Sequence, residues 1–231
     1  MKPFLIFALM GLSACSVNSL GHRPETCDPN ERLADLVKEY NDCLTGKSGK
    51  GSEANHILID CDRAKNQIER LSLEFPRHTP TLLQNATIAY DQREIVKAER
   101  YCDQLLSVEP MHAEGAILKA RIAMENGNLP SARRLLAAQV GYAPGHSLLR
   151  ETYAAVLYMS GDYPAADGQL TAAARLGAPN WRVAFHRGLI AESRKDLYKA
   201  KALYEECLVE NPGFQPAEAR LAGINAEGGV Q

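Results

Sequence analysis

The sequence has few aromatic residues, few cysteines and no large excess of either charge. Aromatic residues make up 6% of its 231 residues, and 26 basic side chains are balanced by 28 acidic ones. This balance excludes a disordered acidic tail, and it lacks the basic excess of a nucleic-acid-binding protein. Six cysteines are too few for a disulfide-built scaffold, so the fold must depend mainly on apolar packing.

Long hydrophobic runs are missing as well. The longest, Pro3 to Leu12, has ten residues, whereas a membrane-spanning helix needs about twenty. Lys2 precedes this run and small residues follow it, an order typical of a secretory signal peptide. We therefore expect residues 1–14 to be absent from the mature protein.

The end of this leader reads Leu12-Ser13-Ala14-Cys15 and resembles the bacterial lipobox at all four positions. The resemblance implies a lipoprotein whose Cys15 carries acyl chains such as palmitate and becomes the new N-terminus. In that family, Ser16 after the cysteine implies the outer membrane, with the folded part anchored by lipid at its periplasmic face. The alternative is an ordinary secretory peptide with Cys15 present by chance. Residues 15–29 are polar and aperiodic, which predicts a flexible tether.

Several residue types recur every 34 positions in the rest of the chain. The repeated registers are two small-residue columns, an apolar column, a proline column and a glycine pair: Ala86, Ala120, Ala154 and Gly188; Ala98, Ala132, Ala166 and Ala200; Cys102, Leu136, Leu170 and Tyr204; Pro110, Pro144, Ala178 and Pro212; Gly127 and Gly161. Small residues allow two helices to approach closely, glycine suits the turn between them, and proline ends the second helix. Each unit is therefore predicted to be a helical hairpin that must stack on its neighbours.

This pattern resembles the tetratricopeptide repeat (TPR). The resemblance implies an all-α fold, a right-handed superhelix of stacked antiparallel helical hairpins, with four units at 79–112, 113–146, 147–180 and 181–214. The columns continue upstream, which predicts a degenerate N-terminal hairpin over residues 30–78. Residues 215–231 are predicted to form a C-terminal capping helix and tail. The family's tryptophan near the start of each unit is missing, and Trp181 lies slightly early.

The remaining cysteines and histidines do not form a convincing reactive or metal site. A bond between Cys43 and Cys61 would close the loop between the first two helices, and Cys27, Cys102 and Cys207 are left unassigned or buried. His78, His112 and His146 are spaced by 34 residues, which would put them in packing layers roughly 8–10 Å apart. Zinc needs its nitrogen ligands about 2.1 Å from one point. We therefore expect turn histidines, with no metal, cofactor, small-molecule substrate or catalytic residue.

The resemblance implies that a protein partner binds the concave face formed by the first helix of each unit. The family's binding positions correspond to Leu83, Thr87, Tyr90, Ile117, Arg121, Met124, Glu151, Ala155, Tyr158, Phe185 and Leu189. The alternative is that several of these residues merely pack between helices. The lysine and asparagine of the family's carboxylate clamp are absent from these columns, which argues against a chaperone-tail binder.

A lipid-anchored TPR protein resembles two functional groups. One is the pilotin-like and TadD-type lipoproteins that assist secretin and pilus assembly in type IV and tight-adherence pili. The other comprises envelope adaptors that recruit peptidoglycan hydrolases or proteases. We expect a non-catalytic scaffold of the first kind, with the adaptor as the alternative and an envelope enzyme as the alternative of another class. The sequence names neither the partner nor the oligomeric state.

Overall fold

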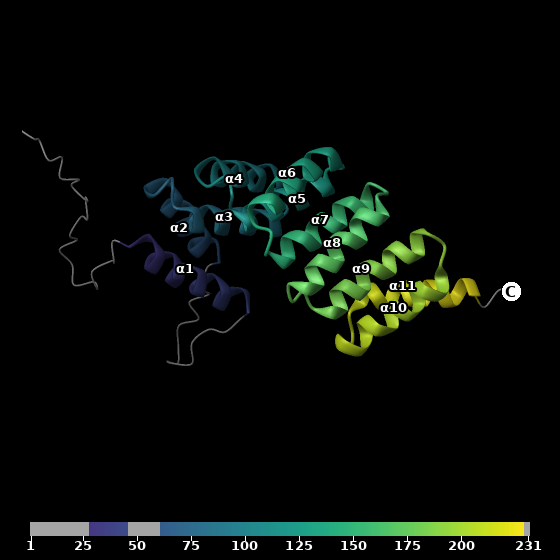
Figure 1. Ribbon diagram of the computed structural model, residues 1–231. Coiled ribbons are helices and arrows are strands. Elements are labelled where there is room, and N and C mark those ends of the chain that lie inside the picture. The colour runs from purple at the N-terminus through teal and green to yellow at the C-terminus, as the bar shows by residue number, and fades with distance from the viewer. Residues whose placement is uncertain (1–27, 46–60, 229–231) are drawn as a thin grey trace, which may run out of the picture. The chain divides into compact units, whose positions relative to one another are not determined.

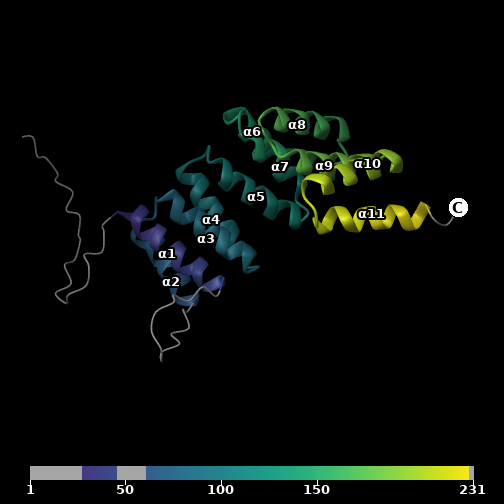
Figure 2. The ribbon, with the colours of Figure 1, turned by 90° about the horizontal axis from the view of Figure 1, so that it is seen from below.

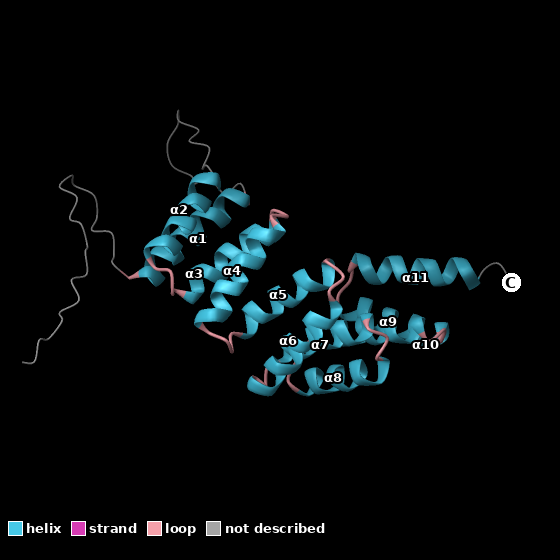
Figure 3. Ribbon diagram, turned by 90° about the horizontal axis from the view of Figure 1, so that it is seen from above, coloured by secondary structure: helices cyan, strands magenta, loops and turns pink. Residues whose placement is uncertain are grey.

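The computed structural model describes residues 28–45 and 61–228, and all regular secondary structure in these ranges is α-helical (Figures 1 and 3). The predicted leader, Cys15 and most of the tether lie outside the described residues, as does Cys27. The chain divides into two compact units, residues 1–78 and residues 79–231.

The described part of the first unit is a helical hairpin made of α1 (Pro29–Leu44) and α2 (Cys61–Glu74). The predicted tether ends slightly early, because Asp28 caps α1 by accepting a hydrogen bond from the Asn30 backbone N–H at 2.8 Å. Apolar side chains from both helices form a small core: Leu33, Tyr40, Ala64, Ile68 and Leu71. At the surface, Arg32 and Glu74 join the two helices through an ion pair of 2.6 Å.

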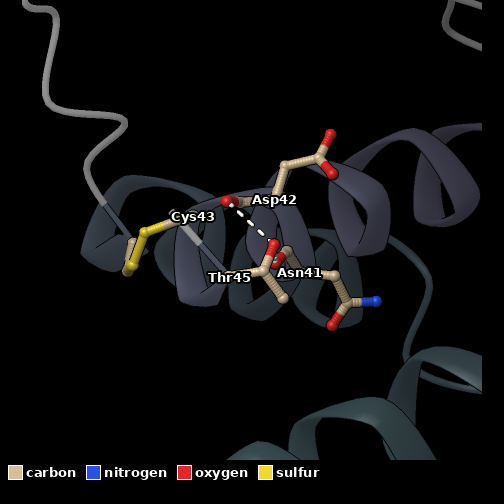
Figure 4. Close-up of a disulfide and its surroundings, with 5 residues drawn as sticks. Asn41, Asp42, Cys43 and Thr45 are labelled. Carbon is tan, nitrogen blue, oxygen red and sulfur yellow. Dashed lines mark hydrogen bonds between the residues drawn. A yellow bond between two sulfur atoms is a disulfide. The ribbon is translucent and has the colours of Figure 1, made fainter. Parts of the chain in front are cut away.

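A disulfide joins Cys43 near the end of α1 to Cys61 at the start of α2 (Figure 4), with their Cα atoms 5.6 Å apart. Next to it, the Thr45 hydroxyl donates a hydrogen bond to the Asn41 carbonyl at 2.9 Å and helps to end α1. The covalent bond therefore lies at one end of the hairpin.

The second unit contains four consecutive hairpins and a final helix (Figure 1). Their bounds are α3 (Thr79–Asp91), α4 (Ile95–Val108), α5 (Ala113–Glu125), α6 (Leu129–Tyr142), α7 (Ser147–Met159), α8 (Tyr163–Arg175), α9 (Asn180–Ser193), α10 (Leu197–Glu210) and α11 (Gln215–Gly228). The predicted all-α architecture of stacked hairpins is confirmed. The final helix α11 lies within residues 215–231, where the sequence predicted a capping helix and tail.

The two small-residue columns lie where helices come closest. Every alanine of the second column is fully buried, and the first column is buried from Ala86 to Gly188. At Gly188 on α9, a Cβ atom would lie only 2.5 Å from Cε1 of Tyr204 on α10. Small residues therefore recur every 34 positions because two helices touch there, and a larger side chain would force the two helices of the hairpin apart.

The turn inside each hairpin needs one residue with positive φ. Gly127 and Gly161 supply it in the second and third hairpins, with φ of 72° and 78°. In the first and fourth hairpins the same register is occupied by Arg93 and Lys195, with φ of 62° and 64°. L-residues rarely adopt this conformation, because Cβ approaches the following carbonyl oxygen.

Two of the three repeating histidines begin helices. Nδ1 of His112 accepts a hydrogen bond from the Gly115 backbone N–H, and Nδ1 of His146 accepts one from Leu149, both at 3.2 Å. They act as N-caps of α5 and α7, which is a more specific role than the predicted turn residue. This geometry requires an unprotonated Nδ1 in each ring.

Helix α11 covers the apolar end of the last hairpin (Figure 2). Ala217 is fully buried against the cluster that contains Tyr204 and Cys207, and Leu221 and Ile224 pack at its edge.

Candidate partner-binding face

The candidate site is the surface formed by the first helices of the four hairpins. Helices α3, α5, α7 and α9 contact one another in succession, so positions separated by 34 residues form rows across them. We call this surface the first-helix face, defined by the eleven positions assigned from the sequence. The structure brings nine of them to half-buried or exposed positions and buries the other two.

Tyr90 and Tyr158 occupy the same position in their repeats and are called the tyrosine column of this face; each makes a hydrogen bond to the next hairpin. The Tyr90 hydroxyl donates to Glu125 at the end of α5, and Nη1 of Arg93 lies 3.3 Å from the same carboxylate. Burial and the hydrogen bond to Glu125 raise the pKa of Tyr90. Two hairpins further along, Ser193 Oγ donates to the Tyr158 hydroxyl at 3.1 Å. The hydroxyls of these two half-buried tyrosines therefore link neighbouring first helices.

Two assigned residues are corrected by the structure. Ile117 is 4% exposed and packs in the core with Leu136 and Leu149. Glu151 is 2% exposed. Position within the repeat predicted an open surface for both, but Ile117 packs against its own hairpin and against Leu149 of α7, and Glu151 lies against Arg182 of α9. The packing alternative therefore holds for Ile117 and Glu151.

Buried Glu151 lies at the centre of a charged group contributed by three helices. Nε of Arg182 on α9 lies 2.8 Å from Oε2 of Glu151 on α7. Burial raises the pKa of the Glu151 carboxyl, and the charges of Arg182 and Arg121 oppose that rise. Arg182 is thus the ion-pair partner of this carboxylate, while Arg121 on α5 is exposed to solvent.

His186 lies one turn after Arg182 on α9. Burial, together with the neighbouring Arg182 charge, lowers the pKa of His186 to about 4. We expect acid to destabilise the fold, because the unfolded chain binds a proton on this residue near pH 6.5 and the folded chain does not. The loss begins as the pH falls below 6.5, is complete near pH 4 and reaches up to ~3 kcal/mol for this one group.

The variant His186→Gln should reduce the acid sensitivity of chemical unfolding between pH 6.5 and pH 4. Urea titrations at several pH values, followed by circular dichroism, measure this effect. If the two proteins show the same pH dependence, His186 does not contribute to it.

The fourth hairpin supplies an aromatic cluster to the end of the face. Phe185 packs edge-on against Phe214, with ring centroids 5.1 Å apart, and Trp181 contacts the same ring at 5.0 Å. Leu189 belongs to the same cluster and is half-buried. Thr87 and Ala155 are also half-buried on their helices, and the Thr87 hydroxyl donates to the Leu83 carbonyl at 2.9 Å.

Sequence reasoning missed a second charged group near the C-terminal end of the face. The Tyr204 hydroxyl donates to Glu192 Oε2 at 2.6 Å, and Nη1 of Arg220 lies 3.1 Å from Glu192 Oε1. Lys195 follows at the turn after α9. One sequence signal was available: Lys195 interrupts the glycine column that contains Gly127 and Gly161.

The described part of the chain offers little for catalysis. It holds no group of three or more histidine, cysteine or acidic side chains able to bind a metal ion. Cys102 and Cys207 are free thiols in the core, and burial raises the pKa of Cys102 to about 12. Neither thiol is therefore activated as a nucleophile. Within residues 28–45 and 61–228, no helix is both long enough and apolar enough to cross a membrane.

Solved structures with similar folds come from several bacteria. A thermophilic TPR protein of Thermus thermophilus is 18% identical with a TM-score of 0.64, over 86% of this chain and 100% of its own. PilF of Pseudomonas aeruginosa is 14% identical with a TM-score of 0.63, over 87% and 82%. A tetratricopeptide repeat protein of Parabacteroides merdae is 17% identical with a TM-score of 0.60, over 84% and 80%. At these identities the comparison shows the fold alone.

Sequence comparison identifies the family. No curated protein matches the chain. The tetratricopeptide repeat family matches residues 83–146 and 154–213, which together make up more than half of the sequence. These ranges run from α3 to the turn that follows α10. The chain belongs to the tetratricopeptide repeat family.

Proposed function

We propose that this protein is a non-catalytic scaffold that binds a protein partner on the first-helix face. Tetratricopeptide repeats bind protein partners and are usually non-catalytic scaffolds. The face combines half-buried apolar and aromatic side chains with a few charged groups, the composition expected of a peptide-binding surface.

Arg121 is the observation that carries this proposal. Its side chain is exposed in the middle of the face, and within the described residues it makes no ion pair or hydrogen bond, although its charge acts at longer range on buried Glu151. Met124 lies on the same helix and is half-buried. An unpaired guanidinium beside apolar surface is suited to a partner, because arginine contributes both a planar apolar surface and several hydrogen-bond donors.

A photo-crosslinking amino acid at position 121 tests this proposal in the native envelope. Position 134 provides the matched control, since Arg134 is also an exposed arginine of the second hairpin but lies on its second helix, α6. We expect an adduct of defined mass from position 121 and none from position 134. Equal adducts from both positions, or none from position 121, would contradict a partner on this face.

We further propose that the partner belongs to a pilus or secretin assembly complex. This step is supported by the resemblance to pilotin-like and TadD-type lipoproteins, with the PilF fold similarity consistent with it. The identity of the adduct decides between the two candidate groups. A secretin or other pilus component supports the proposal, whereas a peptidoglycan hydrolase or a protease supports the envelope adaptor.

Anchoring at the periplasmic face of the outer membrane through lipidated Cys15 is the third part of the proposal, and it is supported by the lipobox resemblance alone. In the variant Cys15→Ser, we expect incorporation of radioactive palmitate to disappear and the protein to leave the membrane fraction, because the acyl chains supply the anchor. Cys27→Ser is the matched control. Unchanged palmitate labelling in Cys15→Ser would refute the anchor.

A further inference from the structure

The C-terminal end of the first-helix face contains a pocket of about 460 Å³. We call it the C-terminal pocket. It is formed by side chains of α7, α9 and α11 and by the turn into α10: Tyr158, Glu192, Ser193, Lys195, Leu197, Ala219, Arg220, Gly223 and Ile224. The pocket continues the tyrosine column, because Tyr158 belongs to both.

Lys195 in this pocket adopts a backbone conformation that favours glycine. Its φ is 64°, and the equivalent positions in the two preceding hairpins are Gly161 and Gly127. Placing lysine there costs stability that glycine would not cost. Such strained positions gather at functional sites, where a side chain is needed despite the cost. The strained backbone therefore indicates that the Lys195 side chain has a role at this position.

Arg93 at the equivalent turn of the first hairpin has a charged partner that Lys195 lacks. Arg93 is the other non-glycine residue at this turn, with φ of 62°, and its guanidinium pairs with Glu125 of the next hairpin. The Lys195 ammonium has no ion pair or hydrogen bond within the described residues. The nearby Glu192 carboxylate is already engaged by Tyr204 and Arg220. One positive charge at the pocket thus remains uncompensated.

The rest of the pocket has room for an apolar side chain. Leu197 and Ile224 contribute apolar surface, and Ala219 and Gly223 contribute little bulk. A Cβ added at Gly223 would meet nothing within 4 Å. The pocket is mainly polar, with apolar surface from Leu197 and Ile224. A free ammonium group near this apolar surface is complementary to an apolar residue that lies next to a carboxylate.

We propose that the C-terminal pocket binds a segment of the protein partner in which an apolar side chain lies next to an acidic side chain. The apolar group enters between Leu197 and Ile224, and the carboxylate pairs with Lys195. This inference rests on the proposed function and names the partner chemistry that one end of the face selects.

Peptide selection tests the proposal. Random twelve-residue peptides displayed on phage are selected on the purified folded protein, and the enriched sequences are compared between wild type and variants. For wild type, we expect enrichment of Asp or Glu directly beside Leu, Ile, Val, Met or Phe. A synthetic enriched peptide should bind about fivefold more weakly to Lys195→Gly in fluorescence anisotropy, as expected for the loss of one partly exposed ion pair. An analogue of this peptide, in which the acidic side chain is replaced by the corresponding amide, should bind wild type more weakly by a similar factor. Its affinity for Lys195→Gly should be nearly the same as that of the original peptide.

Matched variants separate binding from folding. Lys195→Gly should unfold at the same temperature as wild type or slightly above it, because glycine relieves the turn. Arg93→Gly relieves the same turn in the first hairpin and should leave peptide binding unchanged. Gly223→Leu should block the pocket, whereas Gly168→Leu, on α8 and also open to solvent, should not. Lys195→Arg should retain binding.

Each outcome bears on one of the two proposals. Peptides that bind wild type, Lys195→Gly and Gly223→Leu equally overturn the C-terminal pocket and leave the scaffold proposal standing. Enriched peptides without acidic residues also overturn it. If wild type enriches no peptide, both proposals fail. Concentration-dependent dimerisation that Gly223→Leu abolishes would show that a second copy occupies the pocket, and would overturn the partner segment.

Discussion

Replacing Gly188 with alanine is expected to destabilise the fourth hairpin by about 2–3 kcal/mol, the upper part of the roughly 1–3 kcal/mol that overpacking a core typically costs. The new Cβ would lie 2.5 Å from Cε1 and 2.7 Å from Cδ1 of Tyr204. The Tyr204 ring cannot retreat easily, because it is fully buried and its hydroxyl is bound to Glu192 at 2.6 Å. Relief of the clash would therefore require α9 and α10 to separate. Thermal unfolding followed by circular dichroism measures the loss.

Two other glycines serve as controls for this prediction. Gly168→Ala on α8 meets nothing within 4 Å and should be neutral or slightly stabilising, since alanine is the better helix former. Gly115→Ala meets the mobile end of Leu105 at 2.5 Å and should cost less than Gly188→Ala. Equal stability of Gly188→Ala and Gly168→Ala would show that the contact with Tyr204 does not limit residue size.

Removing the disulfide is expected to have the second large effect, confined to the first unit. The bond joins residues 18 positions apart, and closing a loop of that length stabilises a fold by ~3 kcal/mol in the chain-entropy description. The double variant Cys43→Ser, Cys61→Ser should therefore lose hydrogen-exchange protection in α1 and α2. The core of this hairpin is small, so it has little other stability to offset the loss.

Reduction provides the matched control. Dithiothreitol should lower the protection of α1 and α2 in wild type to the level of the double variant, and it should leave the double variant unchanged. Helices α3 to α11 should keep their protection in all samples, because the described residues of the second unit contain only the free thiols Cys102 and Cys207. Unchanged protection of α1 in the double variant would contradict a stabilising role for the bond.

Most of the fold could be read from the sequence because the same packing problem recurs every 34 residues. Each hairpin must place small residues at a close helix contact, a flexible residue in its turn and a helix breaker at its end. These local requirements produce columns of one residue type in the sequence. The four alanines of the column from Ala98 to Ala200 are all fully buried in the structure. The histidines were harder to interpret, since spacing alone did not distinguish a turn residue from the N-caps that His112 and His146 form.

The candidate site depended more strongly on tertiary structure. Position within the repeat predicted the helix face but not the depth of each side chain, and Ile117 and Glu151 are covered by neighbouring hairpins. Lys195 shows the same division between sequence and structure. A break in the glycine column was visible in the sequence, but the left-handed backbone and the pocket became evident only once α7, α9 and α11 were placed together. The sequence alone determined the hairpin period, because that period arises from contacts repeated within each unit. The tertiary structure decided which charges remain unpaired, because pairing depends on side chains brought together from different hairpins.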